Sequence, residues 1–241
     1  MTIKTKCCIC KKEMKIQDSF ALFQNVRMCC EDCEETAAER TLAENQEKYL
    51  EECDRTAQRV RQEFPAQYTL AKMTDLTKTR YYQVKDFTIS DDWCFFIQGN
   101  VGAGKTHISF ITIYEFARKW NTDRVMYFNA SDLVAELQED YRSDGRSISN
   151  YNRIKNCRIL LIDDLGTEKE TDDSLHQIMK VVNYREQCKL KTIITTNLKM
   201  EEIKEKFHAR FLSRIMSGKT IALKGDDRRA DKTAENGQNG A

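Results

Sequence analysis

A glycine-rich loop between a strand-like run and a helical run constrains this chain more than any other feature. Residues 99–106 read Gly-Asn-Val-Gly-Ala-Gly-Lys-Thr, which fits the pattern G-x-x-x-x-G-K-[ST], and the preceding residues 94–98 are suited to a buried strand. This is a phosphate-binding P-loop in the context that the motif requires. The glycines let consecutive backbone N–H groups point at a β-phosphate, and the following helix adds its positive dipole end.

The side chains of the loop indicate which cofactors it would hold. We expect Lys105 to reach the β- and γ-phosphates and the Thr106 hydroxyl to ligate magnesium. The residues predicted to cradle the nucleotide are Gly99, Asn100, Val101, Gly102, Ala103, Gly104, Lys105 and Thr106. The alternative is a chance glycine-rich turn before a helix. The order of strand, loop, Lys-Thr pair and amphipathic helix favours ATP with magnesium.

A second segment ends in two carboxylates. Residues 158–166 read Arg-Ile-Leu-Leu-Ile-Asp-Asp-Leu-Gly, which is typical of a fully buried parallel strand with acids at its carboxyl end. In open α/β sheets, ligands bind at that end of the strands. We therefore expect Asp163 to hold magnesium and Asp164 to polarise an attacking water. Taken alone, the segment also fits a strand followed by a solvated acidic turn.

A third segment contributes an amide. Residues 191–197 read Lys-Thr-Ile-Ile-Thr-Thr-Asn, a short β-branched strand that ends in polar groups. We expect Asn197 to position the water against the γ-phosphate. Thr-Asn after a strand is also common in turns, so the expected role of Asn197 depends on this segment following Asp163 and Asp164 along the chain. His107 lies on the helix after the P-loop and is interpreted as a packing residue.

Six of the ten cysteines lie in the first 33 residues. Two C-x2-C pairs separated by nineteen residues match a four-thiolate zinc site. The predicted zinc ligands are Cys7, Cys10, Cys30 and Cys33. Cys8 and Cys29 leave the ligand set open, and a redox pair or buried thiols are the alternatives. Disulfides are not expected in a cytosolic chain with a P-loop.

A long charged helix is predicted between the cysteines and Pro65, the only proline. Its narrow apolar stripe repeats at steps of three, four and seven residues. The stripe contains Leu42, Tyr49, Cys53, Ala57, Val60 and Phe64. It would pack on the zinc module, on the core domain or on another protein. Pro65 ends the pattern, and we place a domain boundary there.

Beyond Pro65 the strand and helix patterns alternate. The predicted series is strand 94–98, helix 105–120, strand 125–128, helix 132–141, strand 159–162, helix 174–187, strand 192–196, helix 201–207 and strand 219–223. The series predicts an α/β fold, a three-layer α/β/α P-loop NTPase with a parallel sheet covered on both faces. Residues 1–64 would form the zinc module and its helix, 65–225 the nucleotide domain and 226–241 a polar disordered tail.

Composition limits the functional classes. The chain has 241 residues, of which 40% are apolar, and no run approaches the roughly 20 apolar residues of a membrane span. Without a signal-peptide pattern, we expect a cytoplasmic protein. The net charge of +1 gives no global attraction for nucleic acid, so DNA binding needs a local patch.

One segment offers such a patch for single-stranded DNA. Aromatic and basic side chains are interleaved there, a composition suited to binding the backbone and bases of single-stranded DNA without reading their sequence. They are Tyr141, Arg142, Arg146, Tyr151, Arg153 and Lys155. Because Glu139, Asp140 and Asp144 share the segment, a plain solvated surface is an equal alternative.

The motifs GNVGAGKT, LLIDDLG and TTN, followed by Arg210 and Arg214 in Ala-Arg-Phe-Leu-Ser-Arg, resemble the DnaC/DnaI/IstB group of bacterial AAA+ ATPases. The resemblance covers about residues 64 to 229. It implies an AAA+ core without a helical lid, and ATP hydrolysis. The N-terminal cysteines are similar in kind to the zinc-binding module of DnaI-type loaders.

In this group the ATP site lies between subunits, so the resemblance implies self-association and an arginine that acts on the neighbour's γ-phosphate. Arg214 is the first candidate and Arg210 the second. Two arginines one turn apart on a solvated helix face are the alternative. Arg229 stands where the group's G-x-S-x-R ending has a nucleotide-sensing arginine, but the serine is absent here.

The resemblance implies an ATP-dependent loader, from a bacterium or a phage, that places a DnaB-type replicative helicase on single-stranded DNA. The zinc module and its helix would bind the helicase. An IstB-like transposition helper, which acts with a transposase, is the alternative within the fold. A small-molecule P-loop kinase would need an arginine-rich substrate lid, and residues 166–174 do not resemble one. A nucleotide-gated adaptor that barely hydrolyses ATP is a further alternative.

Overall fold

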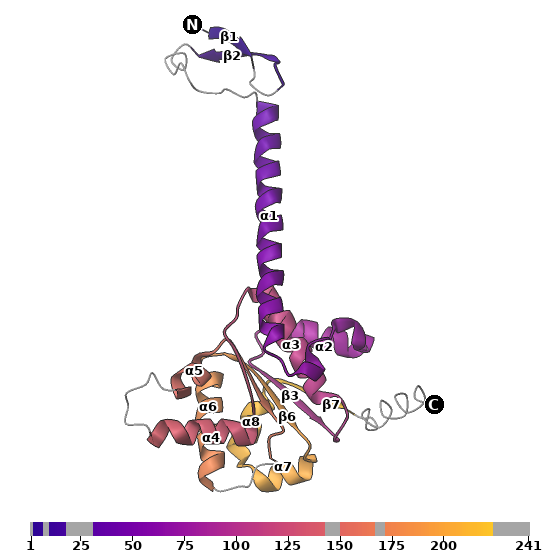
Figure 1. The fold of residues 1–241 in the computed structure, drawn as a ribbon, viewed down its shortest axis with the longest axis vertical. Coiled ribbons are helices and arrows are strands. Elements are labelled where there is room, and N and C mark those ends of the chain that lie inside the picture. Colours follow the sequence, from indigo (N-terminus) through magenta and orange to yellow (C-terminus); the bar gives the residue numbers. More distant parts are fainter. Residues whose placement is uncertain (1, 7–9, 18–30, 143–149, 167–171, 224–241) are drawn as a thin grey trace. The chain divides into compact units, whose positions relative to one another are not determined.

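The computed structural model describes residues 2–6, 10–17, 31–142, 150–166 and 172–223 (Figure 1). The chain divides into two compact units, Met1–Glu52 and Cys53–Ala241. Cys7, Cys30 and Arg229, together with the predicted tail at 226–241, lie outside the described residues. The domain boundary at Pro65 stays a prediction.

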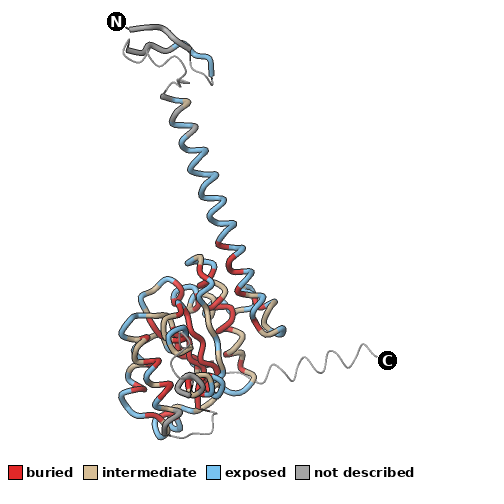
Figure 2. Tube along the Cα trace, turned by 60° about the vertical axis from the view of Figure 1, so that its left-hand side comes forward, coloured by how far each residue is buried: buried red, intermediate tan, exposed pale blue. Residues whose placement is uncertain are grey.

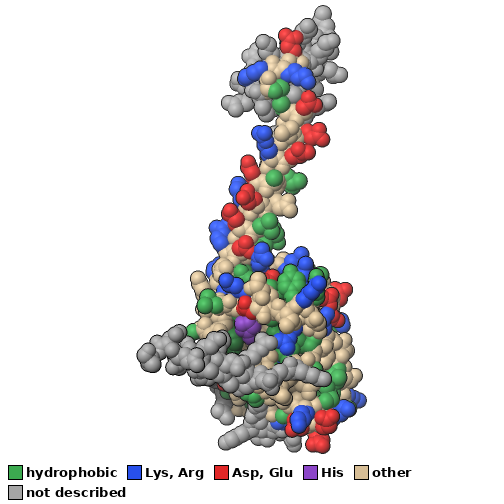
Figure 3. All heavy atoms as spheres, turned by 90° about the vertical axis from the view of Figure 1, so that its right-hand side faces the viewer, with side chains coloured by type: hydrophobic (Ala, Val, Ile, Leu, Met, Phe, Trp, Pro, Cys, Tyr) green, Lys and Arg blue, Asp and Glu red, His purple; other side chains and the backbone are tan. Residues whose placement is uncertain are grey.

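The first unit holds a small sheet and most of helix α1. Strand β1 (Thr2–Lys6) pairs antiparallel with β2 (Glu13–Gln17), and α1 spans Glu31–Gln62. The sequence patterns did not predict these two strands. Leu42 and Tyr49 of the apolar stripe are 69% and 52% exposed. Figure 3 shows side chains of both charge signs mixed along this helix, with few hydrophobic ones between them.

The last turns of α1 belong to the second unit. Cys53, Ala57 and Val60 are buried there, and the ring of Phe64 lies 4.6 Å from that of Phe110 on the P-loop helix. This half of the stripe therefore packs on the core domain, one of the outcomes that the sequence left open.

A five-stranded parallel sheet forms the centre of the second unit. Its order is β4-β5-β6-β3-β7. The strands are β3 (Cys94–Gly99), β4 (Val125–Asn129), β5 (Ile159–Asp163), β6 (Lys191–Thr196) and β7 (Lys219–Leu223). Each lies within one residue of its predicted bounds. Strands β3, β5 and β6 are largely buried on both faces, which explains their continuous apolar runs.

Helices cover both faces of this sheet. They are α2 (Lys78–Ile89), α3 (Lys105–Trp120), α4 (Ala130–Arg142), α5 (Asn150–Asn156), α6 (Asp172–Gln187), α7 (Met200–Lys206) and α8 (Ala209–Ile215), with 3-10 turns η2 (Ala66–Tyr68) and η3 (Met73–Asp75). Successive residues of a strand point to opposite faces of the sheet, and each face has its own hydrophobic core. Phe95 packs with α2 and α3, whereas Phe96 packs with α4, α6 and α8. Figure 2 shows this buried centre. The predicted three-layer α/β/α fold is confirmed.

Three helices of the core domain were absent from the predicted series. Helices α5 and α8 have seven residues each and show little helical period, whereas α7, which is as short, was predicted within one residue of its bounds. Helix α2 buries only Val84, Phe87 and Thr88, so its sequence carries little amphipathic signal. No helix within the described residues combines the length and apolar content needed to cross a membrane.

Candidate nucleotide site

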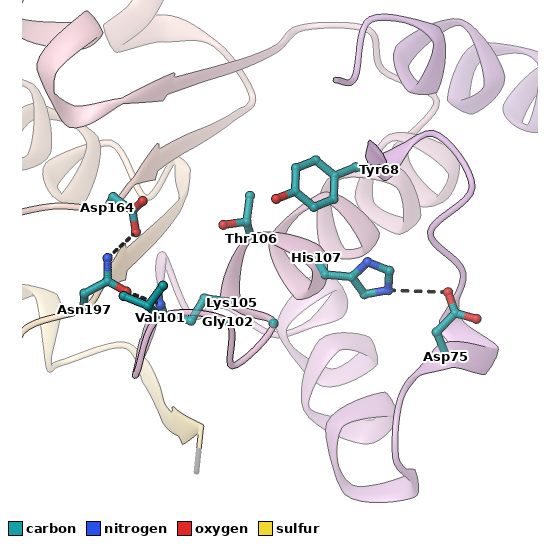
Figure 4. Close-up of a pocket in the computed structure, with 10 residues that line it drawn as sticks. Tyr68, Asp75, Val101, Gly102, Lys105, Thr106, His107, Asp164 and Asn197 are labelled. Carbon is teal, nitrogen blue, oxygen red and sulfur yellow. Dashed lines mark hydrogen bonds and ion pairs between the residues drawn. The ribbon is translucent and has the colours of Figure 1, made fainter. Parts of the chain in front are cut away.

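The candidate site lies where the carboxyl ends of three adjacent strands meet. In the order β5-β6-β3, these strands are followed by Asp164, by Asn197 and by the P-loop. A cavity of about 400 Å³ opens between them. It is lined by Tyr68, Asp75, Val101, Gly102, Gly104, Lys105, Thr106, His107, Asp164 and Asn197 (Figure 4). The fold thus brings together three segments that the sequence predicted to act on one nucleotide.

The glycines shape the loop as the motif requires. Gly102 and Gly104 have φ angles of 76° and 90°, in the left-handed region that glycine adopts without steric cost. At Gly99, a Cβ atom would lie 2.8 Å from the carbonyl oxygen of Leu223, so only glycine fits beside β7. Helix α3 begins at Lys105, which directs its N-terminal N–H groups into the loop.

Lys105 connects the loop to the end of β6. Its side chain is buried, and its Nζ donates to the carbonyl oxygen of Asn100 at 3.0 Å and to Oδ1 of Asn197 at 2.5 Å. Nδ2 of Asn197 in turn donates to Oδ1 of Asp164 at 2.9 Å. The amide therefore links the cation of the loop to the carboxylate expected to orient water.

Asp163 faces the first turn of α3. Oγ1 of Thr106 donates to Oδ2 of Asp163 at 2.9 Å, and Oγ1 of Thr195 donates to Oδ1 at 2.5 Å. Burial raises the pKa of the Asp163 carboxyl, and the charge of Asp164 adds to this effect, while the two hydroxyl donors and Lys105 oppose it. A buried carboxylate beside a hydroxyl is a donor set that Mg²⁺ prefers, and the cation would offset the desolvation. These residues fit magnesium.

Asp164 adopts an unusual backbone conformation. Its φ is 55°, in the left-handed region that costs a non-glycine residue about 1–3 kcal/mol and that aspartate tolerates better than most. Its N–H donates to Oγ1 of Thr195 at 2.9 Å. This conformation places the side chain in the cavity beside Asn197 (Figure 4).

The side of the cavity opposite Asp164 and Asn197 contains residues that the sequence motifs did not indicate. The ring of Tyr68 stacks on Phe110 at 4.8 Å, and Nε2 of His107 lies 3.4 Å from Oδ2 of Asp75. His107 is therefore not simply a packing residue, because it lines the cavity and pairs with a carboxylate. Tyr68 and Asp75 lie 31 and 24 residues before Gly99, in 3-10 turns, so no local pattern connects them to the P-loop.

The two candidate arginines lie on α8, and neither lines the cavity of its own chain. Nη1 of Arg214 donates to Oδ1 of Asn183 at 2.6 Å and lies 3.2 Å from Oε2 of Glu186. Arg210 is exposed and makes no hydrogen bond or ion pair with any described residue. Arg214 is thus held by two side chains, whereas Arg210 is exposed to solvent.

The predicted DNA patch is only partly described. Arg146 lies outside the described residues, and only the backbone of Tyr141 and Arg142 is described. On α5, Nζ of Lys155 lies 4.9 Å from the ring centre of Tyr151 and 4.8 Å from that of Tyr184, while Arg153 is exposed.

The predicted zinc site is not visible as a cluster. Cys10 is exposed and Cys33 is half-buried, whereas Cys7 and Cys30 are not described. Within the described part of the chain, no three His, Cys, Asp or Glu side chains are grouped to hold a metal. The zinc prediction therefore has no support from the described residues.

Comparison with known proteins gives a family match and curated relatives. The model of a family described as IstB-like ATP binding protein matches residues 20–224. The replicative helicase loader DnaC of Escherichia coli K12 is 26% identical over 151 residues, which are 62% of this chain and 60% of that protein. DnaC of Shigella flexneri matches with the same values. The match thus spans about 60% of the length of these relatives.

Solved structures share the fold. A crystal structure of the DnaC helicase loader superposes with a TM-score of 0.58 at 21% identity, covering 66% of this chain and 100% of that one. DnaI gives 0.53 at 20% identity, covering 69% and 94%. The replication initiator DnaA bound to AMPPCP and single-stranded DNA gives 0.56 at 20% identity, covering 68% and 52%.

Proposed function

The chain belongs to the IstB-like ATP-binding protein family, and we propose that it is a cytoplasmic, ATP-hydrolysing loader of a DnaB-type replicative helicase onto single-stranded DNA. The observation that carries the proposal is the cavity in which the P-loop, Asp164 and Asn197 converge. The similarity to DnaC and the shared fold with DnaI support helicase loading as the purpose of ATP use.

Bound ATP with magnesium supplies the reactive phosphoanhydride bond and the metal charge. Lys105 would exchange its bond to Asn197 for phosphate oxygens, and Thr106 and Asp163 would hold the magnesium. Asp164 would orient the attacking water, while Asn197 keeps the Asp164 carboxylate turned into the cavity. The nucleobase would lie toward Tyr68 and His107, on the side of the cavity away from Asp164.

An arginine from a neighbouring copy would complete the site. Arg214 is the first candidate, and in this structure Asn183 and Glu186 of α6 hold its guanidinium. Its ion pair with Glu186 would have to yield to a phosphate, whereas exposed Arg210 has no such bond to any of the described residues. We retain Arg210 as the second candidate.

DNA and the helicase would bind at separate surfaces. The cation of Lys155 lies against the rings of Tyr151 and Tyr184, and together with Arg153 it forms an aromatic and basic surface suited to single-stranded DNA. The first unit, with the exposed side chains of Leu42 and Tyr49, would contact the helicase.

We predict one zinc ion per chain, held by Cys7, Cys10, Cys30 and Cys33. Replacing Cys30 and Cys33 with serine should remove the zinc and abolish helicase binding, because metal binding supplies most of the folding energy of such small modules. ATP affinity should stay within about twofold, since nucleotide contacts lie in the second unit. Metal analysis, helicase binding and nucleotide titration measure the three effects. Metal-free protein that still binds helicase would remove zinc from the mechanism.

A transposition helper is the second candidate, because the matching family model is described as IstB-like. The two functions predict different partners for the ATP-bound protein: a replicative helicase for the loader and a transposase for the transposition helper. We would pass the purified chain, with and without ATP, over immobilised DnaB-type helicase and over the transposase of an IstB-linked element from the same organism. The loader predicts ATP-dependent retention on helicase alone, with Lys105→Ala as the control. Retention on transposase alone would reverse the assignment.

A further inference from the structure

A ring of hydrogen bonds, completed by short stretches of backbone, connects residues on one side of the candidate site. Lys105 contacts Asn197, and Asn197 contacts Asp164. Thr195 then connects Asp164 with Asp163, and Asp163 returns to Thr106, the residue after Lys105. The ring therefore joins α3, the end of β5 and the end of β6 through side chains and short stretches of backbone.

Thr195 occupies a distinct place in this ring. Its side chain is fully buried at 0% exposure, and its hydroxyl is both donor and acceptor. Oγ1 donates to Oδ1 of Asp163 at 2.5 Å and accepts the N–H of Asp164 at 2.9 Å. One hydroxyl thus contacts the carboxylate of the first acid and the backbone of the second. The neighbouring backbone adds a third link, because the N–H of Leu165 donates to the carbonyl oxygen of Thr195 at 2.8 Å.

We propose that Thr195 is a positioning residue for ATP hydrolysis, whose hydroxyl fixes the magnesium-holding carboxylate of Asp163 and the left-handed backbone of Asp164 relative to each other. This inference deepens the proposed function and rests on it. Thr195 does not line the cavity and acts only through the two acids.

Lys105 and Thr106, which also belong to the ring, would change their hydrogen-bond partners when ATP binds. In the proposed mechanism, Lys105 turns to the phosphates and Thr106 to magnesium, so both exchange the partners seen here. Thr195 would keep its partners when ATP binds, because it is buried beneath Asp163 and Asp164 and does not line the cavity. Its bonds would therefore hold Asp163 and Asp164 in register during turnover. The bond to Asp163 also opposes the rise in the pKa of that carboxyl caused by burial.

Other hydroxyls on β6 provide a matched control. Thr192 is also fully buried, and its Oγ1 accepts from Nε of Arg185 at 2.9 Å and donates to the carbonyl oxygen of Leu190 at 3.1 Å. It lies at the opposite end of the same strand from the acids. Thr192→Val thus removes a buried donor and acceptor from β6 without touching the site.

The test compares Thr195→Val, Thr195→Ser and Thr192→Val with the wild type. Loss of the Thr195 hydroxyl should lower kcat by about tenfold to hundredfold and raise the magnesium concentration at half-saturation by a similar factor, as for outer partners of metal ligands. At saturating magnesium, the KM for ATP should stay within about twofold, since phosphate contacts are unchanged. Serine keeps the hydroxyl and should restore both values. Thr192→Val should lower the melting temperature but leave kcat and the magnesium requirement at wild-type levels.

Two readouts keep the outcomes separate. Magnesium titration of the binding of a fluorescent ATP analogue needs no hydrolysis, so it tests Thr195 even if the wild type proves inactive, which would count against the proposed function alone. Thr195→Ala replaces the valine variant if that protein does not fold. If Thr195→Val kept the kcat and magnesium requirement of the wild type, the inference would be overturned. It would also be overturned if Thr195→Ser lost as much activity and magnesium affinity as Thr195→Val.

Discussion

Replacing Lys105 with alanine should weaken ATP binding by at least about a hundredfold, because charge-assisted hydrogen bonds to phosphate contribute about 1.5–3 kcal/mol each and Lys105 is the only cationic side chain in residues 99–106. Hydrolysis should fall to background. Equilibrium titration with a fluorescent ATP analogue measures the first effect and phosphate release measures the second.

Asp164→Asn is the matched control. It keeps Asp163 and Thr106 as magnesium ligands and keeps a polar group beside Asn197. ATP affinity should therefore remain within about threefold, while kcat falls by about 100-fold or more, the usual range for loss of a group that acts in the transition state. Equal losses of affinity in the two variants would refute this division between binding and turnover.

Mixing the inactive Arg214→Ala and Lys105→Ala proteins should restore part of the ATPase activity. If Arg214 acts on a neighbour, the first variant lacks the arginine and the second lacks the phosphate contact, so some junctions in a mixture combine an intact P-loop with an intact Arg214. An arginine supplied in trans is worth about 10³–10⁵ in kcat, so even a quarter of intact junctions would exceed the summed activity of the separate variants.

The mixture must be shown to co-assemble, for example by light scattering with ATP and DNA. Co-assembly without recovery at any ratio would exclude Arg214 as the acting residue. The same mixture made with Arg210→Ala would then test the exposed alternative on α8. A self-contained kinase would show no recovery with either arginine.

The sheet and the phosphate end of the site could be predicted from the sequence because their signals are local. Strands buried on both faces have continuous apolar runs, such as residues 159–163, and the P-loop residues are consecutive. The order of acids and amide after successive strands was enough to place Asp163, Asp164 and Asn197 at one edge.

The remaining parts of the site depend on tertiary contacts. Thr195 looks like an ordinary β-branched strand residue, and its role is visible only once β5 and β6 are neighbours. Tyr68 and Asp75 reach the cavity only because the segment after α1 packs against α3. Strands β1 and β2 belong to a small unit in which the cysteine spacing was a stronger signal than strand alternation.

Helicase loading onto closed circular single-stranded DNA would distinguish a loader from a protein that only binds the helicase, because a circle offers no end for a helicase ring to thread. DnaB-type helicase, this protein and ATP would be incubated with the circle, and helicase retained on the DNA would be measured after gel filtration. We expect ATP-dependent retention with the wild type and background retention with Lys105→Ala or without ATP. A helicase that binds the protein yet stays off the circle at every ATP concentration would contradict the assignment as a loader.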